Sequence, residues 1–384
     1  MNRVALQMLV GDRGKHFGVL LGITFACLLI TLVGSMFTGI MYRFTATIRD
    51  AGGADIWVTD PKVQFIDDVK PLPDSALWRV RSVPGVDWAV PFYKGSLRAK
   101  LPDGSFQNCA VFGIDDASLA IGPPEMALGS LADLRRTDGV IVDERGAARR
   151  LAQPLPGGGT RPLTIGDTLE LNDHRAVVVG ICRISRTFQS SPTIYTTYKR
   201  AMAFAPRERR QLSFVLAKAA PGADAEAVCR TISERTGLLA MTADEFKRKS
   251  VWYFLRNTPI PVNVGLMVVL AFIVGSAITG LSFNSFVLEN LRYFGALKAM
   301  GAGRGLIVRM TLIQAGWVGG IGYGLGTGIA TLLCFLLRRT EAEFRTPGIL
   351  LAISAGAVVL IITGAALVSL RKVMRLEPAI VFRS

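Results

Sequence analysis

The chain has 384 residues, of which 50% are hydrophobic, and its 44 Lys and Arg residues against 29 Asp and Glu residues give a formal net charge of +15. A soluble protein of this length is usually less apolar and closer to charge balance. A basic excess fits binding to nucleic acid, binding to anionic lipid, or positively charged cytoplasmic loops. The chain has no Lys/Arg-rich block interleaved with aromatic residues, so we expect no nucleic-acid partner and favour the lipid bilayer.

The first predicted element is a membrane span over residues 16–42, which contain no Asp, Glu, Lys or Arg. The run exceeds the roughly 20 apolar residues that cross about 30 Å of hydrocarbon. It is also longer than the apolar region of a signal peptide, which has about 7 to 15 residues, so we interpret it as an uncleaved anchor. Three later runs meet the same criterion, and the four predicted spans are residues 16–42, 257–288, 310–337 and 346–370.

Residues 43–256 separate the first two spans, and their mixed pattern predicts a large α+β domain of two lobes. Strand-like runs over residues 86–100 and 106–114, on either side of Pro102–Gly104, predict a β-hairpin. Residues 73–81 are expected to form a helix capped by Asp74. The other predicted elements are strands over 54–59, 140–142, 212–218 and 238–241, a second hairpin over 168–171 and 176–184, a helix ending near 151, a helix over 223–236, and a helix capped by Thr242 that leads to the second span.

Residues able to support catalysis are few in this domain. His174, beside Asp173, is its single histidine, and the chain contains no G-x-S-x-G motif. The cysteines form no C-x-x-C pair, and Cys109, Cys182 and Cys229 allow at most one disulfide among them. We therefore predict no catalytic residue, no metal site and no cofactor bound by this chain.

The loop over residues 289–309 follows the second span and is the most informative stretch. It is helix-prone and contains a small-residue step at Gly301–Ala302–Gly303. A short stiff helix between two spans transmits force to them, whereas a flexible linker dissipates it. An ordinary connector between helices is the alternative, but it would need neither this length nor a face bearing Arg and Lys.

The third predicted span carries glycines at an unbroken four-residue spacing. Such small residues allow close approach of another helix. The partner helix could belong to the same chain or to a second copy in a homodimer, and both alternatives remain open. The glycines of this stripe are Gly316, Gly320, Gly324 and Gly328.

Positive charge in the short loops predicts the orientation, because Lys and Arg accumulate on the cytoplasmic side. Residues 1–15, 289–309 and 371–384 each carry more basic than acidic residues. We therefore expect a multi-pass protein of the bacterial inner membrane with both termini in the cytoplasm. Residues 43–256 and a short loop over 338–345 are then extracytoplasmic.

Three motifs resemble those of the MacB/FtsX-like ABC transporter permeases, the type VII or mechanotransmission class. Residues 1–15 look like the amphipathic helix that precedes the first span in this family, and finer features are most similar to its DevC/HrtB branch. The loop resembles the family's coupling helix at Glu289, Arg292, Gly295, Leu297, Lys298, Ala299, Gly301 and Ala302, and the tail resembles the C-terminal signature at Arg375, Leu376, Pro378 and Arg383.

The resemblance implies a homodimer bound to a cytosolic ABC ATPase dimer, which holds the ATP and Mg²⁺, with or without a periplasmic adaptor (a membrane fusion protein). The chain lacks the phosphate-binding motif G-x-x-x-x-G-K-[ST], since its nearest candidate, Gly14–His16, has neither the hydroxyl nor the upstream glycine. ATP hydrolysis would thus belong to a separate subunit. ATP binding would move the coupling helices, and the spans would relay that motion to the outer domain to expel a substrate.

One position departs from the family pattern, because Tyr293 stands where many relatives carry a Glu two residues before the loop glycine. That difference puts a salt bridge to the ATPase at this point in doubt. Two alternative functions remain: an FtsX-like regulator of periplasmic cell-wall hydrolases that transports nothing, and a lipoprotein-release permease. A membrane enzyme ranks last. Haem as cargo cannot be read from a chain whose only histidines are His16 and His174.

Overall fold

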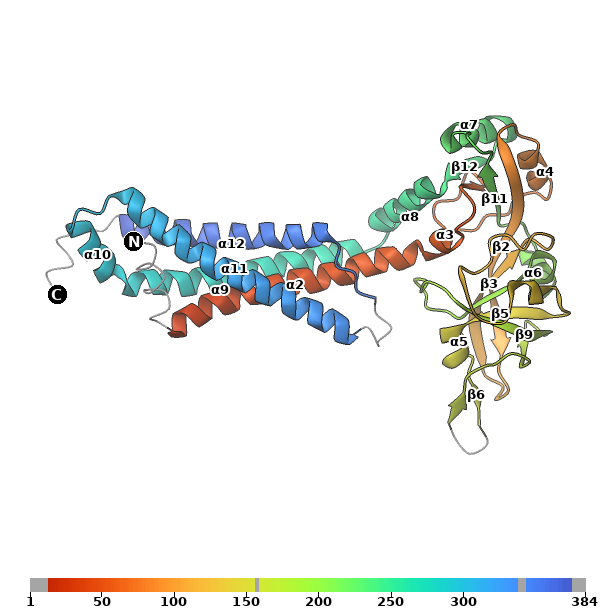
Figure 1. Cartoon of the computed structure of the whole chain (residues 1–384), viewed down its shortest axis with the longest axis horizontal. Helices are drawn as coiled ribbons and strands as arrows, with labels where there is room; N and C mark the ends of the chain where they lie inside the picture. The colour runs from red at the N-terminus through yellow and green to blue at the C-terminus, as the bar shows by residue number, and fades with distance from the viewer. Residues whose placement is uncertain (1–12, 156–158, 338–342, 375–384) are drawn as a thin grey trace. The chain divides into compact units, whose positions relative to one another are not determined.

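The computed structural model describes residues 13–155, 159–337 and 343–374. The backbone divides into two compact units, the first made of Met1–Ile40 and Thr258–Ser384 and the second of Met41–Asn257. Four helices among the described residues are long and apolar enough to cross a membrane. They are α2 (Arg13–Phe44), α9 (Ile260–Glu289), α11 (Arg304–Leu336) and α12 (Gly348–Met374), and the short helix α10 (Leu291–Ala299) connects α9 to α11 (Figure 1).

All four helices begin a few residues from the predicted starts of the charge-free runs, and α9 and α11 show the cause. α9 begins at Ile260 because the preceding helix ends at Asn257, with Pro259 at the N-cap of α9 and Pro261 in its first turn, where a missing N–H costs nothing. α11 begins at Arg304, within the predicted loop, because Gly303 adopts an extended conformation at the N-cap. Helix α11 therefore includes charged residues that the sequence assigned to the loop.

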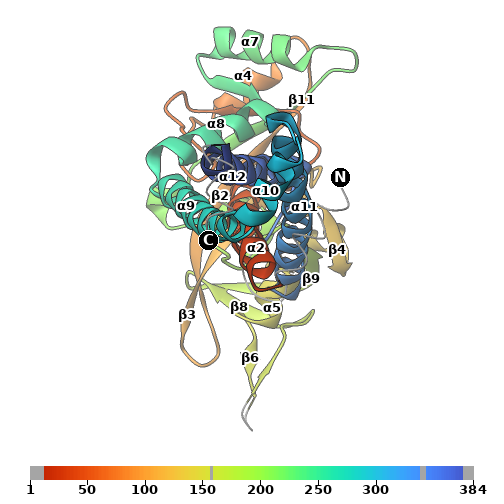
Figure 2. The same ribbon diagram turned by 90° about the vertical axis from the view of Figure 1, so that its left-hand side faces the viewer.

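Helix α2 makes close glycine contacts with two neighbouring helices. A methyl group on Gly275 of α9 would overlap Ala26, and a methyl group on Gly322 of α11 would overlap Ile23. Figure 2 shows the helices end-on, with α2 between α9 and α11. The absence of a side chain at these glycines is what allows the backbones to approach closely.

The second unit is built on one ten-stranded mixed sheet with the order β12-β1-β11-β2-β3-β10-β5-β9-β4, in which β8 also pairs with β2 and β9. A separate ribbon joins β6 to β7. The strands are β1 (Ile56–Thr59), β2 (Val86–Lys100), β3 (Phe106–Ile114), β4 (Glu125–Leu128), β5 (Gly139–Asp143), β6 (Gln153–Pro154), β7 (Thr160–Arg161), β8 (Thr168–Leu171), β9 (His174–Arg183), β10 (Thr193–Thr197), β11 (Phe214–Ala219) and β12 (Leu239–Thr242).

Strand β2 belongs to both halves of this sheet. Its first part, from Val86 to Phe92, pairs with β11, and its second part, from Tyr93 to Lys100, pairs with β3. The β2–β3 hairpin has the predicted bounds, with Gly104 at a φ of +81° in its turn. The two predicted lobes thus meet on a single continuous strand.

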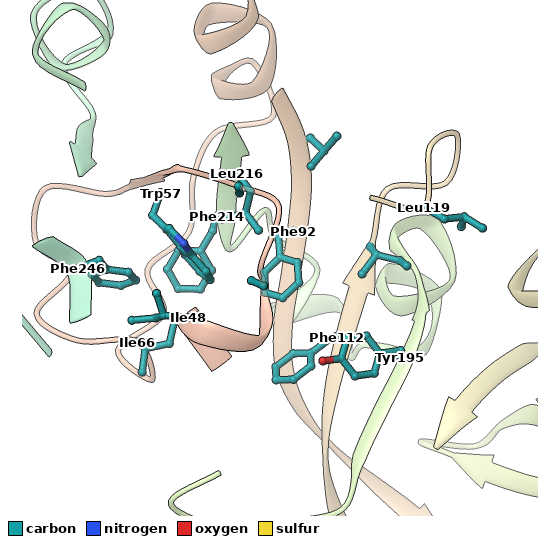
Figure 3. Close-up of a cluster of buried hydrophobic side chains, with 14 of the residues drawn as sticks. Ile48, Trp57, Ile66, Phe92, Phe112, Leu119, Tyr195, Phe214, Leu216 and Phe246 are labelled. Carbon is teal, nitrogen blue, oxygen red and sulfur yellow. The ribbon is translucent and has the colours of Figure 1, made fainter. Parts of the chain in front are cut away.

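An aromatic cluster fills the core beside this shared strand (Figure 3). The Trp57 ring lies 5.5 Å from both Phe214 and Phe246 and 6.0 Å from Phe92, measured between ring centroids. Trp57 is fully buried, as is Phe246. Burial of such large rings is the main source of hydrophobic stabilisation in a domain of this size.

Short helices cover the sheet. The predicted cap of the helix after residue 73 is wrong, because α4 begins at Ala76 with Ser75 at its N-cap and has no side-chain cap bond. The predicted Thr242 cap is correct: Thr242 N donates to Glu245 Oε2 (2.9 Å) and Glu245 N donates to Thr242 Oγ1 (3.3 Å), a capping box. The helical elements of this unit are α3 (Ala46–Asp50), α4 (Ala76–Arg81), η1 (Leu131–Arg135), α5 (Glu144–Ala148), α6 (Tyr198–Phe204), η2 (Arg207–Arg209), α7 (Ala225–Thr236) and α8 (Ala243–Asn257).

Candidate functional site

The candidate coupling segment is α10, and its start is fixed by Asn290. α9 ends at Glu289, and buried Asn290 donates from Nδ2 to the carbonyl oxygen of Phe286 (2.8 Å). The same carbonyl oxygen also accepts from Asn290 N (3.2 Å), so both the backbone and the side chain of Asn290 are tied to the last turn of α9. One helix therefore stops here and another begins at Leu291.

The end of α10 is a Schellman motif centred on Gly301. Ala302 N donates to Leu297 O (2.9 Å), Gly301 N donates to Lys298 O (3.1 Å), and Gly301 has a φ of +90°. This pair of bonds with a left-handed glycine is the standard way to close a helix. The small-residue step seen in the sequence is thus a defined helix stop, and α10 is a stiff element of nine residues.

One face of α10 is open. Tyr293 is 63% exposed and Met300 is 75% exposed, and Ala296 between them is also exposed. Their spacing of three and four residues places them on one side of a helix. Gly295 is buried, and Leu297 and Lys298 are half-buried. An exposed Tyr and Met on a short helix is an apolar surface suited to a protein partner.

Several predicted site residues fall outside what the structure describes. Arg292 and Ala299 lie in α10, but their side chains are not among those described. Glu289 is exposed at the end of α9 and Ala302 is half-buried. The C-terminal motif residues Arg375, Leu376, Pro378 and Arg383 all lie outside the described residues.

The glycine stripe of α11 faces away from the described parts of the chain. No described atom lies within 4 Å of a methyl group built on Gly316, Gly320, Gly324 or Gly328. Three other glycines of the same helix pack instead, with Gly319 against Ile362 and Gly322 and Gly326 against α2. The stripe therefore packs against no other helix in the described part of the chain. This result leaves contact with a second copy as the remaining alternative.

An aromatic cluster, here the junction cluster, joins the two places where the chain enters and leaves the second unit. Phe44 is the last residue of α2, and Phe254 lies near the end of α8. Phe188, from the loop after β9, lies 6.0 Å from Phe44 and 5.7 Å from Phe254. Phe65 and Tyr253 stack beside them at 4.5 Å. Sequence analysis missed this cluster, although the aromatic residues flanking the charge-free runs were a signal.

The described residues contain no group of three or more His, Cys, Asp or Glu able to hold a metal ion. All five cysteines are buried, and none of them forms a disulfide in the part of the chain that the structure describes. Burial raises the pKa of Cys109 and of Cys229 to about 12, which suppresses the nucleophilic thiolate. Burial also raises the pKa of Asp143, which accepts bonds from Thr193 N (2.6 Å) and Gly146 N (2.7 Å) and so braces a loop.

Family models match almost the whole chain. The model of the MacB-like periplasmic core domain matches residues 17–235, more than half of the sequence, and the model of the FtsX-like permease C-terminal region matches residues 265–378. The chain therefore belongs to the MacB/FtsX-like family of ABC transporter permeases. It is a multi-pass membrane protein of a class that works with a cytosolic ATPase.

Two curated relatives are uncharacterized ABC transporter permeases of Mycobacterium tuberculosis, from strains CDC 1551 and H37Rv. Each is 25% identical to this chain over 352 residues, which cover 90% of both proteins. Among solved structures, the periplasmic region of MacB from Actinobacillus actinomycetemcomitans matches with a TM-score of 0.38 and 14% identity over 55% of this chain and 96% of that one. The extracellular domain of YknZ from Gram-positive bacteria matches with a TM-score of 0.33 and 11% identity over 49% of this chain and 98% of that one.

Proposed function

We propose that this chain is the permease subunit of an ABC export complex that works by mechanotransmission. The observation that carries the proposal is α10, a nine-residue helix that is fixed at Asn290 and at Gly301 and exposes Tyr293, with Met300 exposed at its C-cap. A helix closed at both ends moves as one piece when a partner presses on it. Because α9 and α11 continue directly from it, its displacement is passed to both helices.

In this mechanism a pair of cytosolic ATPases binds ATP and Mg²⁺, closes and displaces the α10 helices of two permease copies. The exposed apolar face of α10 contacts the ATPase, and the half-buried Lys298 adds positive charge to this helix. Tyr293 at the family's Glu position makes this contact more apolar than ionic. A periplasmic adaptor extends the complex where the envelope has an outer membrane.

The proposed orientation places α10 and both termini in the cytoplasm and residues 43–256 outside the inner membrane. The excess of basic residues in the short loops supports it. The substrate is expelled from the outer face by motion of this domain.

A homodimer is part of the proposal. Gly316, Gly320, Gly324 and Gly328 lie on α11 with no described atom of the chain within 4 Å of their missing side chains. A second copy of α11 would fill this surface, with close packing of the two backbones as the gain.

The decisive experiment is affinity purification of the full chain from its native membrane, followed by identification of any co-purifying ATPase. We expect a P-loop ATPase to co-purify, and we expect Met300→Glu or Tyr293→Glu to remove it. Leu128→Glu is the matched control. Leu128 is likewise an exposed apolar residue (55% exposed), but it lies in the second unit. Arg292→Glu should leave the complex assembled but uncouple ATP hydrolysis. A chain that functions fully without an ATPase would contradict the proposal.

Orientation is tested separately by thiol labelling of intact cells with a membrane-impermeant maleimide. Lys62→Cys, an exposed position in the second unit, should react in intact cells, and Met300→Cys should react only after permeabilisation. Equal labelling of both variants in intact cells would show that the proposed topology is wrong.

A further inference from the structure

The second unit contains a cavity of about 340 Å³ that no part of the proposed mechanism uses. Segments far apart in the sequence form its walls: the end of α2, the loop after β1, the middle of β2, strand β3, the loop after β9 and the turn around η2. This volume lies at the lower end of the range for small-molecule sites, roughly 300 to 1,000 Å³. At about 30 Å³ per water-sized volume it holds a ligand of roughly ten non-hydrogen atoms.

The apolar part of the wall consists of aromatic rings with one aliphatic side chain. Phe44, Phe112, Phe188 and Val69 line the cavity. Phe112 is buried, and Phe44 and Phe188 belong to the junction cluster. These rings offer a surface on which a hydrocarbon segment gains by leaving water.

The polar part of the wall is cationic. Arg43, Lys94 and Arg209 line the cavity against a single acid, Asp67, which pairs with Lys94. Arg43 donates from Nε to Thr187 O (3.2 Å), and Arg209 donates from one guanidinium nitrogen to Ser96 O (3.3 Å), so both guanidinium groups are held in position. The balance of charge around the cavity favours an anion.

The hydroxyl of Tyr93 gives a second, independent indication that the cavity binds a ligand. The Tyr93 side chain is only 1% exposed and lines the cavity, yet its hydroxyl has no hydrogen-bond partner among the described residues. Buried tyrosine hydroxyls nearly always find a partner, because an unmet bond is costly. Arg209 is near enough for its charge to act on the hydroxyl, whose pKa is raised by burial and lowered by that charge.

Gly95 makes room at this point. A methyl group at position 95 would overlap the Tyr93 hydroxyl, and Gly95 itself lines the cavity. The end of the Tyr93 ring therefore lies over Gly95 of the same strand, and only a glycine leaves room for it there.

We propose that this cavity binds an amphipathic anion, with a carboxylate or phosphate between Arg209 and the Tyr93 hydroxyl and a short hydrocarbon segment against Phe44, Phe112 and Phe188. The hydroxyl donates to the anion, and Arg209 provides the opposite charge, a charge-assisted arrangement. The ligand is either a membrane lipid with an anionic headgroup or a free fatty acid, because the two share this chemistry. Binding requires neither the ATPase nor transport, so the inference stands or fails independently of the proposed function.

The test is equilibrium dialysis of radiolabelled octanoate against the purified full chain in phosphatidylcholine nanodiscs, with empty nanodiscs as the blank. Octanoate has both an anionic and an apolar part and matches the size of the cavity. We expect saturable binding of octanoate, at least fivefold weaker binding of octanol, and no binding of inorganic phosphate at the same concentration. Equal affinity for octanoate and octanol, or no saturable binding at all, would overturn the proposal.

Variants locate the binding site. Tyr93→Phe keeps the ring and should weaken octanoate binding about tenfold to a hundredfold, the range for one hydrogen bond to a charged group. Arg209→Ala should weaken it about tenfold, while Arg207→Ala, in the same short helix but outside the cavity, should change it less than twofold. Equal losses for Arg209→Ala and Arg207→Ala would place binding elsewhere and refute the assignment. The comparison of octanoate with octanol remains decisive even if a variant fails to fold.

A final arm identifies the natural source of the ligand. Replacing half of the phosphatidylcholine with phosphatidylglycerol adds an anionic headgroup to the membrane. Loss of octanoate binding under that condition supports the cavity as a lipid site, and unchanged binding supports it as a site for a free fatty acid.

Discussion

The ring of Phe44 lies 4.9 Å from the ring of Phe254, with the two planes inclined at 52°. Phe44 ends α2, and Phe254 belongs to α8, so the segment that leads into the second unit touches the segment that leads out of it. Phe188 contacts both rings edge-on. Because these rings are in contact, movement of either segment displaces the other segment and the loop after β9.

Replacement of Phe254 tests this contact. Phe254 is 2% exposed, so Phe254→Ala should destabilise the second unit by about 3 to 5 kcal/mol, the usual cost of removing a buried ring. Denaturant unfolding in nanodiscs measures the loss. Trp252→Ala is the control, because Trp252 is 58% exposed and should cost less than about 1 kcal/mol. A double-mutant cycle with Phe44→Ala should give a coupling energy of about 0.5 to 1.5 kcal/mol, and a coupling near zero would mean that the rings do not act together.

Gly301 and Gly303 provide a matched pair at the end of α10. Neither glycine has a described atom within 4 Å of an added methyl group, but Gly301 has a φ of +90° and Gly303 has a φ of −66°. Gly301→Ala should cost about 1 to 2 kcal/mol, because an L-residue is strained in the left-handed region. Gly303→Ala should cost less, about 0.5 kcal/mol, because Gly303 has an ordinary φ and only the preference for glycine over alanine at the N-cap of α11 is lost. Thermal unfolding measures both, and equal stability of the two variants would argue against the Schellman closure.

The glycine stripe of α11 is tested by comparing Gly324 with Gly322. Gly324→Leu meets no described atom of the chain and should leave the monomer intact, while removing the homodimer if the stripe is its interface. Gly322→Leu would overlap Ile23 and should destabilise the monomer itself by about 1 to 3 kcal/mol. Mass photometry in nanodiscs measures the dimer fraction. A dimer that survives Gly324→Leu and Gly320→Leu together would assign the interface to another surface.

The pair Arg161–Asp167 should make local stability depend on pH. The guanidinium donates to both carboxylate oxygens (2.9 and 2.8 Å), and its hydrogen bonds lower the pKa of Asp167. A lowered folded-state pKa adds stability above the unfolded value of about 3.9, and that stability is lost as pH falls through the folded pKa. Asp167→Asn should therefore speed hydrogen exchange around Thr164 about twofold to fivefold at pH 7, the range for a partly exposed pair.

The same difference should shrink below about pH 4, when exchange rates are corrected for their intrinsic pH dependence. Arg161→Lys keeps the charge but loses the two-pronged geometry, so its effect should be intermediate. A difference between Asp167→Asn and the unchanged protein that is constant from pH 7 to pH 3 would exclude the ion pair as the cause.

The native cysteines should not react with maleimide while the chain is folded. Burial raises the pKa of Cys109 and of Cys229 to about 12, so only about one thiol in 10,000 is ionised at pH 8, and neither sulfur is accessible. Mass spectrometry after labelling at pH 8 should find no adduct, and denaturation should expose the thiols. Rapid labelling of Cys109 in the folded protein would mean that the sheet unfolds locally around β3 and exposes this thiol.

Much of the fold follows from local sequence. Charge-free runs gave the four apolar helices because lipid tolerates no unpaired charge over that length. Pro102–Gly104 gave the β2–β3 hairpin, and Thr242 gave the start of α8, because turns and caps depend on a few neighbouring residues. The small-residue step at Gly301 was recognised, although its hydrogen bonds were not.

Long-range pairing could not be read in the same way. β10 lies parallel to β3, with Tyr195 opposite Phe112, although some 80 residues separate them in the sequence. The roles of the glycines in α11 depend equally on the fold, since Gly322 packs against α2 while Gly324, two residues later, does not. The cavity around Tyr93 is lined by six segments that are distant in the sequence, and no one of these segments carries a pattern that predicts it.

The shared strand β2 has a consequence for how this domain can be altered. One half of β2 hydrogen-bonds to β11 and the other half to β3. Dividing the domain between its two lobes would therefore leave each lobe with an unpaired strand edge. Grafting only one lobe from a relative would require the seam to pass between Phe92 and Tyr93. A slip of one residue there would turn every side chain of the transplanted half to the opposite face, so recombinants should tolerate exchange of the whole domain far better than exchange of either half.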